Sequence, residues 1–355
     1  MSNPIALVTG SLPPEVCGVG DYTSRLHAEL DGVDLVHVPI RRAYESALFD
    51  IFQGRELVHI EYPTEGWGNS LLPSFLPLAK KRCLLLLTLH EWSQMNRIRR
   101  ASILPLVSRA DGFIFVSEQE REHFAASAPK AARQKPSWVI PIGVNLEVPS
   151  LTEEEILAKR AELAGEPFLT HFGFIHAGKQ PEKLLDTVEA LKRKGKNPHL
   201  VFIGDFQKDK TAEKEAFQAL LHSRGLAPLV TMLGFVQDDR EAALIMAAAD
   251  ASISLFEDGL SPRRGSFWYA TQHGRPAITT EPVGEGPENF GELTQFLKPP
   301  QVHFVRAGAT GQQIADVIES LPPYKPKKHA PIPVPTWRDI ATRHKAVYRE
   351  MLGRG

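Results

Sequence analysis

The sequence has few cysteines, no long hydrophobic run and almost no net charge, and each of these excludes a class of protein. Its two cysteines, Cys17 and Cys83, are too few for a disulfide framework, which favours a reducing compartment. The longest apolar run, CLLLLTL, has the size of a strand, whereas a membrane-spanning helix needs about 18 residues or more. The N-terminus lacks the basic and then apolar layout of a signal peptide. We therefore expect a cytoplasmic protein.

Charge and size set two further limits. The 41 basic and 42 acidic residues give a net charge of -1, which argues against a nucleic-acid binder, because such a protein needs a basic face to neutralise phosphates. The hydrophobic fraction of 43% and the charged fraction of 23% are those of an ordinary globular protein. At 355 residues the chain exceeds what one hydrophobic core usually supports, so we expect two domains.

Short apolar runs alternate with helix-like segments along the whole chain. Continuous apolar runs are typical of strands buried on both faces, as in parallel sheets. Two successive series of such runs predict an α/β protein with two Rossmann-like, doubly wound domains. The predicted strands are 5–9, 34–40, 56–60, 83–89, 112–116 and 137–141 in the first half, and 168–172, 199–204, 229–233, 251–256, 276–280 and 302–306 in the second.

Helix signals and a proline-rich segment indicate where the domains end. The clearest helix begins at Pro181 and ends at Gly195, with an apolar stripe between them. Asp21 is the predicted N-cap of a helix near the N-terminus, and Thr336 is that of the final helix. The proline-rich stretch 321–335 is predicted to be an extended connection. The predicted domains are residues 1–149 together with the final helix 336–355, and residues 150–330.

Two glycines follow the first predicted strand, in the sequence SLPPEVCGVGDY. Gly18 and Gly20 would let the backbone approach a ligand closely at a strand-to-helix turn, with the N-terminus of the following helix directed at that ligand. A tight turn without any ligand explains the same residues, because a Gly-x-Gly sequence alone is a weak signal.

Polar side chains follow two other predicted strands of the first half. His90 and Glu91 come after strand 83–89, and Glu61 comes after strand 56–60. Ligands of open α/β sheets bind at the carboxyl ends of strands, so we expect these side chains to share one crevice. An imidazole there can bond a substrate hydroxyl or serve as an acid or base. Structural roles stay open for both, with His90 capping a loop and Glu61 an ordinary loop carboxylate.

The segment FGFIHAGKQPEKLL opens the second half with a candidate phosphate contact. Gly173 closes a strand, and Lys179 precedes the helix that begins at Pro181. A lysine at this place can reach a phosphate that lies over the helix N-terminus. A solvated lysine is the alternative interpretation.

A second candidate lies in the segment DGLSPRRGS. Arg263 and Arg264 precede Gly265 and Ser266, where a short helix is predicted to begin. The arginines can make bidentate, charge-assisted bonds to a phosphate, and the Gly-Ser pair can add backbone N–H groups and a hydroxyl. The alternative is that the arginines pair with Glu257 and Asp258 across the loop.

Taken in order, these parts resemble the GT-B glycosyltransferases. The glycine-rich loop, the histidine after the strand ending in TL, PIGVN before the linker and GKxxxxLL at the start of the second half all contribute. So do ADASISL, the arginine loop with its HGRP ending and the terminal WRDIA…Y helix. The sequence is most similar to the retaining nucleotide-sugar enzymes of glycosyltransferase family 4, from about Ile5 to Tyr348.

The resemblance implies a donor diphosphate held across a cleft between the two domains. Lys179 and the loop 263–266 would contact the diphosphate, and His90 would face the transferred sugar. Glu61 and Glu91 would lie on the acceptor side, and the final helix would cross back to the first domain with Trp337 as its anchor. The implied catalytic residues are His90, Lys179 and Arg263, and the implied donor-binding residues are Gly18, Gly20, Gly173, Lys179, Gly204, Val236, Arg263, Arg264, Gly265 and Ser266.

The sequence departs from the pattern of this family at three places. The family usually carries an arginine where this chain has Phe174, and two glutamates where it has Ser261 and Tyr269. Some members resemble this chain, with DG-x-S-x-RRGS in place of the glutamates. Arg263 and Arg264 would then replace the arginine that is absent at Phe174.

The sequence therefore predicts a glycosyltransferase that moves a sugar from a nucleoside diphosphate to an acceptor hydroxyl with retention of configuration. No Asp-x-Asp metal motif is present, so neither a metal nor another cofactor is expected. Two alternatives remain, a catalytically silent sugar-nucleotide-binding or scaffolding protein and another GT-B enzyme such as an epimerase.

The predicted acceptor is a glycan or a lipid-linked sugar. Apolar residues of a predicted helix lie near basic residues, which is the pattern of an amphipathic helix at a membrane surface. This pattern predicts peripheral contact with the inner membrane face, and the alternative is that the helix packs on its own sheet. The residues are Leu71, Leu72, Phe75, Leu76 and Leu78, with Lys80, Lys81 and Arg82.

Overall fold

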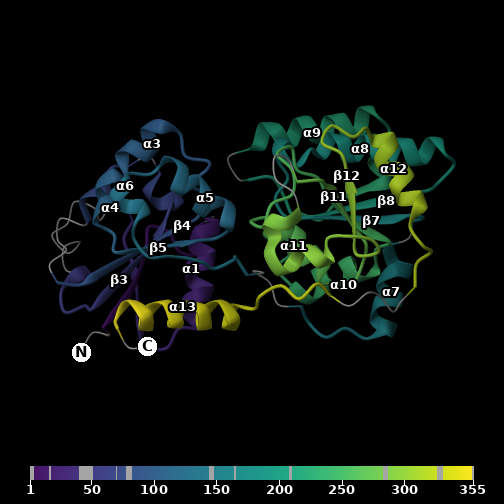
Figure 1. The fold of residues 1–355 in the computed structure, drawn as a ribbon. Helices are drawn as coiled ribbons and strands as arrows, with labels where there is room; N and C mark the ends of the chain where they lie inside the picture. Colours follow the sequence, from purple (N-terminus) through teal and green to yellow (C-terminus); the bar gives the residue numbers. More distant parts are fainter. Residues whose placement is uncertain are drawn as a thin grey trace. The chain divides into compact units, whose positions relative to one another are not determined.

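The structure is a computed structural model that describes residues 4–15, 17–39, 51–68, 70–76, 82–143, 148–163, 165–207, 210–282, 287–325 and 331–353. The chain divides into two compact units, Met1–Asn145 with Pro335–Gly355, and Leu146–Val334. Each unit contains one six-stranded sheet with helices packed against it (Figure 1). All twelve predicted strands are present, and the α/β class with two Rossmann-like domains is confirmed.

The first unit is built on strands β1 Ile5–Thr9, β2 Val33–His37, β3 Leu57–Tyr62, β4 Leu84–Leu89, β5 Gly112–Phe115 and β6 Ser137–Val139. They lie in the order β2-β1-β3-β4-β5-β6, and all neighbouring strands are parallel. Apolar clusters cover both faces of the sheet, which explains why β4 and β5 are almost continuously apolar. Its described helices are α1 Gly18–Ala28, α2 Leu72–Phe75, α3 Arg97–Ser102, α4 Leu104–Arg109, α5 Glu118–Ser127, α6 Lys130–Arg133, α13 Trp337–Met351 and the 3-10 helix η3 Glu65–Trp67.

The final helix α13 belongs to the first unit although it ends the chain. Thr336 caps it as predicted, and Asp339 returns the bond to the Thr336 backbone in a capping box. Its buried face joins the apolar cluster that includes α1, and the Trp337 ring meets the Tyr22 ring edge-on with centroids 5.2 Å apart. In Figure 1 this helix, in yellow, runs beside the purple helix α1.

Helix α1 begins earlier than the sequence predicts. Cys17 is its N-cap, and the Cys17 sulfur accepts a hydrogen bond of 3.3 Å from the Gly20 N–H. Asp21 therefore lies inside the helix, where it pairs with Arg25 one turn later at 3.3 Å. The prediction of Asp21 as N-cap is wrong because Gly18 and Gly20 adopt helical conformation, which extends the helix towards the N-terminus.

The second unit is built on strands β7 Phe168–Phe172, β8 His199–Ile203, β9 Val230–Met232, β10 Ala251–Ser254, β11 Ala277–Thr280 and β12 Val302–Val305. Their order is β12-β11-β10-β7-β8-β9, again all parallel. The strand order therefore reverses between β7 and β10, where ligands of doubly wound sheets bind. Its described helices are α7 Glu153–Leu163, α8 Pro181–Arg193, α9 Thr211–Ser223, α10 Asp239–Ala248, α11 Gly265–Thr271 and α12 Gly311–Ser320, with 3-10 helices η5 Ala177–Lys179, η6 Ala227–Leu229 and η7 Pro287–Phe296.

The helix and linker predictions in the second unit can be compared with the structure directly. Helix α8 begins at Pro181, and Gly195 follows it with a φ of 78°. The residues of its predicted apolar stripe are buried, whereas α7 has no buried residue and lies at the surface of the unit. The described parts of the proline-rich stretch, 321–325 and 331–335, form neither helix nor strand.

The predicted surface helix of the first unit is described only in part. Helix α2 is a single turn, and Leu71, which precedes it, and Phe75, its last residue, are each 53% exposed. Leu78, Lys80 and Lys81 lie outside the described residues. None of the described helices has the length and apolar character needed to span a membrane.

Candidate functional site

The predicted phosphate contacts of the second unit lie at its switch point. Gly173 directly follows β7, and the loop 257–264 follows β10, so both begin at the carboxyl ends of neighbouring strands. The Glu257 N–H donates to the Gly178 carbonyl at 2.9 Å, which joins this loop to η5 and hence to Lys179. Two segments that lie far apart in the sequence thus form one site.

Gly173 and Gly204 make close backbone packing possible at this edge of the sheet. Gly173 has a φ of 99°, and a Cβ there would lie 2.8 Å from the Lys179 nitrogen and 3.0 Å from the Ser266 Cβ. A Cβ on Gly204, whose φ is 140°, would lie 2.2 Å from the Gly173 carbonyl oxygen. The absence of a side chain at Gly173 therefore leaves room for the Lys179 ammonium, and its absence at Gly204 lets the backbone of Gly173 approach.

Lys179 is a buried cation with neutral partners. Lys179 is the last residue of the 3-10 helix η5 and is 7% exposed. Its Nζ donates to the Ser266 hydroxyl at 3.2 Å and to the Phe172 carbonyl at 3.4 Å. Burial, together with the positive charge of Arg264, lowers the pKa of Lys179 to about 7. The ammonium form is thus destabilised by its surroundings, and a bound anion would stabilise it.

The two arginines have different surroundings. Arg264 forms an ion pair with Asp258, and its guanidinium lies 4.6 Å from the centroid of the Phe256 ring. The loop salt bridge considered as the alternative is therefore present for Arg264, although the same arginine still lowers the pKa of Lys179. Arg263 is half-buried in the same loop.

His176 adds a further basic group to this cluster. Burial lowers the pKa of His176, and the charges of Lys179 and Arg264 lower it further, whereas Asp258 raises it. Three basic side chains therefore influence one another at the carboxyl end of the sheet. We call Lys179 and Arg264 the cation cluster, with His176 as its neighbour.

The start of helix α11 contributes a hydroxyl to this site. Ser266 lies in its first turn with its oxygen next to Lys179, whereas the Gly265 N–H already donates to the Arg263 carbonyl at 2.9 Å. The Gly265 N–H is therefore used within the turn, and the hydroxyl of Ser266 is the polar group that contacts the cation cluster. Val236, the last predicted member, is half-buried after β9.

The positions that depart from the family pattern also lie at this site. Phe174, in place of an arginine, is 42% exposed beside Gly173. Tyr269, in place of a glutamate, is buried, with its ring centroid 4.7 Å from that of Phe172. Ser261 is half-buried. An aromatic ring thus packs inside the unit where a glutamate was expected.

The glycine-rich segment of the first unit lies beside a neighbouring loop. A Cβ on Gly20 would meet the Ser11 carbonyl oxygen at 2.8 Å, whereas one on Gly18 would meet nothing within 4 Å. Gly18 is exposed, and the Glu65 N–H also donates to the Cys17 sulfur at 3.4 Å. Gly20 is therefore required for close packing, and only Gly18 leaves open space above the helix N-terminus.

His90 and Glu61 are in direct contact, as their places at the ends of adjacent strands predict. The Glu61 side chain is 0% exposed and the His90 side chain 3%, and His90 Nε2 lies 2.7 Å from Glu61 Oε2. Burial would raise the pKa of Glu61, but the neighbouring His59 and the hydrogen bond from His90 outweigh this effect and lower it. Because Glu61 is fully buried, it can act on an acceptor only through His90. Glu91, by contrast, is exposed.

Sequence reasoning did not find the residues that surround this pair. His59 of β3 and His344 of α13 lie next to Glu61, and the ligand atoms of these three residues lie within 4.8 Å of one another, which makes them a candidate metal group among the described residues. Each ring nitrogen already has a polar neighbour: His59 has Thr88 and Tyr348, and His344 has Tyr22 and the Ile340 carbonyl. A hydrogen-bonded network accounts for the group without a metal. The available signal was the alternation in LVHIEY, which puts His59 and Glu61 on one face of the strand.

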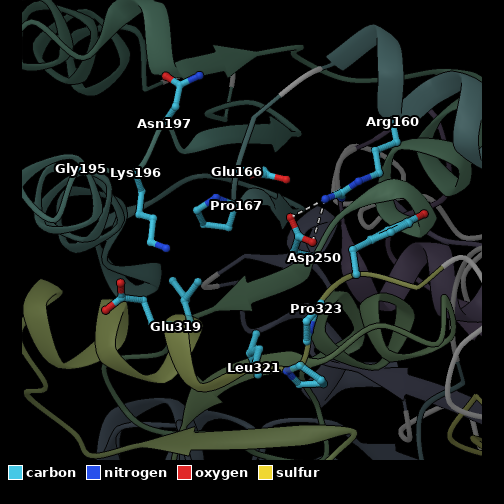
Figure 2. A pocket seen from close by; sticks show the side chains of 13 residues that line it. Arg160, Glu166, Pro167, Gly195, Lys196, Asn197, Asp250, Glu319, Leu321 and Pro323 are labelled. Carbon is cyan, nitrogen blue, oxygen red and sulfur yellow. Dashed lines mark hydrogen bonds and ion pairs between the residues drawn. The ribbon is translucent and has the colours of Figure 1, made fainter.

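A separate hollow of about 780 Å³ lies at the opposite end of the second sheet, near the beginnings of β7, β8 and β10. Figure 2 shows Arg160 and Asp250 directed at each other within it, with Arg160 Nη2 2.9 Å from Asp250 Oδ1. The Arg160 and Arg275 guanidinium carbons lie 3.7 Å and 3.9 Å from the centroid of the Tyr324 ring. These charges hold the start of the proline-rich connection against the unit, so the hollow has a structural explanation.

No protein-family model and no curated protein matches the sequence. Solved structures do match. HepE from Anabaena in complex with UDP shares 16% identity, covers 98% of this chain and 94% of its own, and has a TM-score of 0.65. Sucrose-phosphate synthase from Thermosynechococcus elongatus shares 17% identity over 99% of this chain and 100% of its own, with a TM-score of 0.67. A glycosyltransferase from Rickettsia africae shares 14% identity over the full length of both chains, with a TM-score of 0.69.

The chain has a GT-B glycosyltransferase fold. At such low identity the similarity establishes the fold alone, so the activity has to be inferred from the side chains of this chain. On this fold, the cation cluster lies at the carboxyl edge of the second sheet and His90 at the carboxyl edge of the first.

Proposed function

We propose that the protein is a glycosyltransferase that moves a sugar from a nucleoside diphosphate sugar to an acceptor hydroxyl. Its fold is that of glycosyltransferases, and among the similar structures HepE holds UDP or UDP with glucose. The chemistry of the cation cluster fits a diphosphate for independent reasons.

The observation that carries this proposal is the state of Lys179. A lysine buried with neutral partners is costly, because its charged form loses hydration without an anion to compensate it. Its nitrogen contacts the Ser266 hydroxyl at the switch point of the sheet, and the charge of Arg264 is close enough to lower its pKa. Two adjacent cations and a hydroxyl are suited to the charge that develops on a departing diphosphate, because they stabilise it without reorganising.

The remaining steps follow from this assignment. We place the transferred sugar near His90, which would hold one of its hydroxyls, and we propose retention of configuration. The acceptor oxygen would then attack from the face that the diphosphate leaves, and a phosphate oxygen would take its proton. Because the cation cluster can neutralise the leaving group, we propose a reaction that requires neither a metal nor another cofactor.

Arg264 and Arg263 are the two further candidates for contacting the diphosphate. In the absence of ligand, Asp258 is the partner of Arg264, and a diphosphate would compete with this carboxylate for the guanidinium. We keep Arg263 as a second diphosphate contact, since it belongs to the same loop.

For the acceptor we propose a glycan or lipid-linked sugar at the cytoplasmic face of a membrane. Leu71 and Phe75 are each 53% exposed, and Ile98 in the basic helix α3 is 82% exposed. Exposed apolar side chains near arginines are suited to the surface of an anionic bilayer.

The test measures binding first and chemistry second. A thermal-shift series with nucleoside diphosphates and their sugars should identify the donor, because a ligand that binds only the folded state raises stability by mass action. Release of free sugar from that donor without acceptor, and transfer with one, should follow. Binding without either reaction would favour a silent binding protein, and an altered donor sugar would favour an epimerase. The absence of any diphosphate binding would reject the proposal.

A further inference from the structure

His90 belongs to a closed ring of buried side chains in the first unit. Going round, His90 contacts Glu61, Glu61 contacts His59, and His59 contacts helix α13. From α13 the ring returns through Tyr22 to His90. All six members, His90, Glu61, His59, Tyr348, His344 and Tyr22, are 3% exposed or less.

The geometry on the strand side follows from the register of the sheet. Glu61 lies opposite Thr88 in the pairing of β3 with β4, and the His90 N–H donates to the Tyr62 carbonyl at 2.9 Å. His90 therefore emerges beside the Glu61 side chain. His59 is two residues before Glu61 on the same strand, so both side chains project from the same face.

The proton positions of the ring are determined by its charges. Ionised Glu61 can only accept, so His90 donates through Nε2–H at 2.7 Å and keeps Nδ1 as an acceptor when neutral. Burial lowers the pKa of His59 to about 3, so its imidazole is neutral. His59 Nε2 lies 2.6 Å from Thr88 Oγ1 and 3.3 Å from Glu61 Oε1, and we assign its single proton to this nitrogen because an ionised carboxylate can only accept.

Helix α13 completes the ring with two side chains one turn apart. Because His59 Nδ1 has no proton, it accepts from the Tyr348 hydroxyl at 2.8 Å. His344 donates through Nδ1 to the Ile340 carbonyl at 2.9 Å, so its Nε2 is an acceptor for the Tyr22 hydroxyl at 3.3 Å. The His344 ring also stacks on His59, with centroids 5.7 Å apart.

Tyr22 completes the closed network of six side chains. Its aromatic ring meets the His90 ring edge-on, with centroids 4.8 Å apart and an interplanar angle of 79°. Glu61 thus sets the direction of the His90 Nε2–H bond, and Tyr22 restricts the plane of the imidazole. Each of the six side chains has a polar or aromatic neighbour within this network, and loss of one member of a buried network is costly.

We propose that Glu61 is a positioning residue for His90, and that α13 contributes to the same task by holding His59 and Tyr22 in place. Glu61 is buried away from any acceptor, so its effect reaches the reaction through the orientation and tautomer of the His90 imidazole. The final helix is then a support of the site as well as a packing element. This inference rests on the proposed function for its kinetic test only, since the orientation of His90 can be observed without substrate.

The kinetic test uses Glu61→Leu, which removes charge and acceptor, and Glu61→Gln, which keeps one acceptor oxygen. Glu61→Leu should lower kcat roughly ten- to hundredfold, the range expected for a hydrogen bond to a charged group. Nucleoside diphosphate affinity should stay unchanged, because Glu61 does not belong to the cation cluster. Glu61→Gln should recover part of the loss. In a His90→Ala background, Glu61→Leu should cause no further loss of kcat, since the residue through which it acts is absent.

The spectroscopic test needs no turnover. Long-range imidazole ¹H–¹⁵N spectra of the ligand-free protein should show His90 as the Nε2–H tautomer, with His90→Gln identifying its signals. In Glu61→Leu both tautomers should be populated, and Tyr348→Phe should move the His59 signals and lower kcat in the same direction. These spectra decide the inference even if the wild type transfers no sugar.

A matched control is Asp111→Asn. The Asp111 carboxylate accepts from the Leu85 N–H at 2.7 Å, at the other end of the same sheet. It should cost stability while leaving kcat and the His90 spectrum as in the wild type. An unchanged His90 tautomer in folded Glu61→Leu, or an additive loss of kcat in the His90→Ala background, would overturn the proposal.

Discussion

Replacing Lys179 by methionine removes the ammonium of the cation cluster while keeping a similar side-chain volume. If the ammonium binds a donor diphosphate, the change deletes a charge-assisted contact worth roughly 1.5–3 kcal/mol. That corresponds to about a ten- to hundredfold weaker affinity for the nucleoside diphosphate. The affinity for the bare nucleoside should hardly change, because it lacks the charge that Lys179 meets.

The pH dependence of this binding distinguishes Lys179 from an ordinary surface lysine. With a pKa of about 7, the residue is half neutral at that pH in the free protein, and a bound diphosphate raises its pKa. The affinity should therefore fall as the pH rises above 7, by up to about fiftyfold between pH 7 and pH 9. The range begins at pH 7 because a terminal phosphate itself titrates near pH 6.

The assay is calorimetric titration of nucleoside diphosphate at pH 8 in two buffers with different enthalpies of ionisation. The difference between the two heats gives the number of protons taken up on binding, which should be about 0.9 for the wild type at this pH. Lys179→Met should take up none and should show no comparable loss of affinity between pH 7 and pH 9. Equal proton uptake and equal pH slopes in the two proteins would refute the assignment of Lys179 as the diphosphate-binding cation.

The stability of the free protein tests the same residue independently. The folded pKa of Lys179 is lower than the unfolded one, so the unfolded chain binds more protons between about pH 7 and 10.5, and stability rises with pH across that window. Below pH 7 the full cost of charging the buried lysine is present, at most about 5 kcal/mol. Lys179→Met should therefore raise the free energy of unfolding at pH 6, by an amount that shrinks towards pH 10. A destabilised variant at pH 6 would contradict this reasoning.

Three further predictions concern neighbouring residues. Arg263→Ala and Arg264→Ala should each weaken diphosphate binding roughly ten- to hundredfold, and for Arg264→Ala calorimetry should also show a raised Lys179 pKa, because a like charge is gone; wild-type binding in both would make them loop salt-bridge residues. His90→Ala should lower turnover strongly with little change in nucleotide affinity, and unchanged steady-state kinetics in the folded variant would return His90 to a structural role. Gly173→Ala should destabilise the fold by roughly 1–3 kcal/mol and weaken diphosphate binding, because its φ of 99° disfavours a side chain and the new Cβ would meet Lys179; chemical denaturation with the wild-type midpoint would disprove this.

The sequence by itself determined most of the secondary structure and the edge of each sheet at which the candidate residues lie. Strands buried on both faces are largely apolar, so β4 and β5 could be recognised without any partner. Caps and breakers are local, which is why Thr336 and Pro181 mark the starts of α13 and α8 correctly. Asp21 failed as a cap because a cysteine took that place, a residue that propensities do not favour there.

The placement of Lys179 near the arginine loop was also within reach of the sequence, because parallel strands bring their carboxyl ends to one edge. Its state was not. The neutral partners of Lys179 and the ion pair of Arg264 with Asp258 depend on how three loops pack, and loop sequences carry no periodicity from which this could be read.

Only the tertiary structure decided that Glu61 is fully buried and in contact with His90. The side chains that explain this come from β3, α1 and α13, and the bond between His59 and Tyr348 joins residues 289 positions apart. A strand or helix pattern tells which face of an element is buried, but not which distant polar group meets another on that face. Burial then sets the protonation of every member of the ring, because a charge in the interior persists only where a partner compensates it.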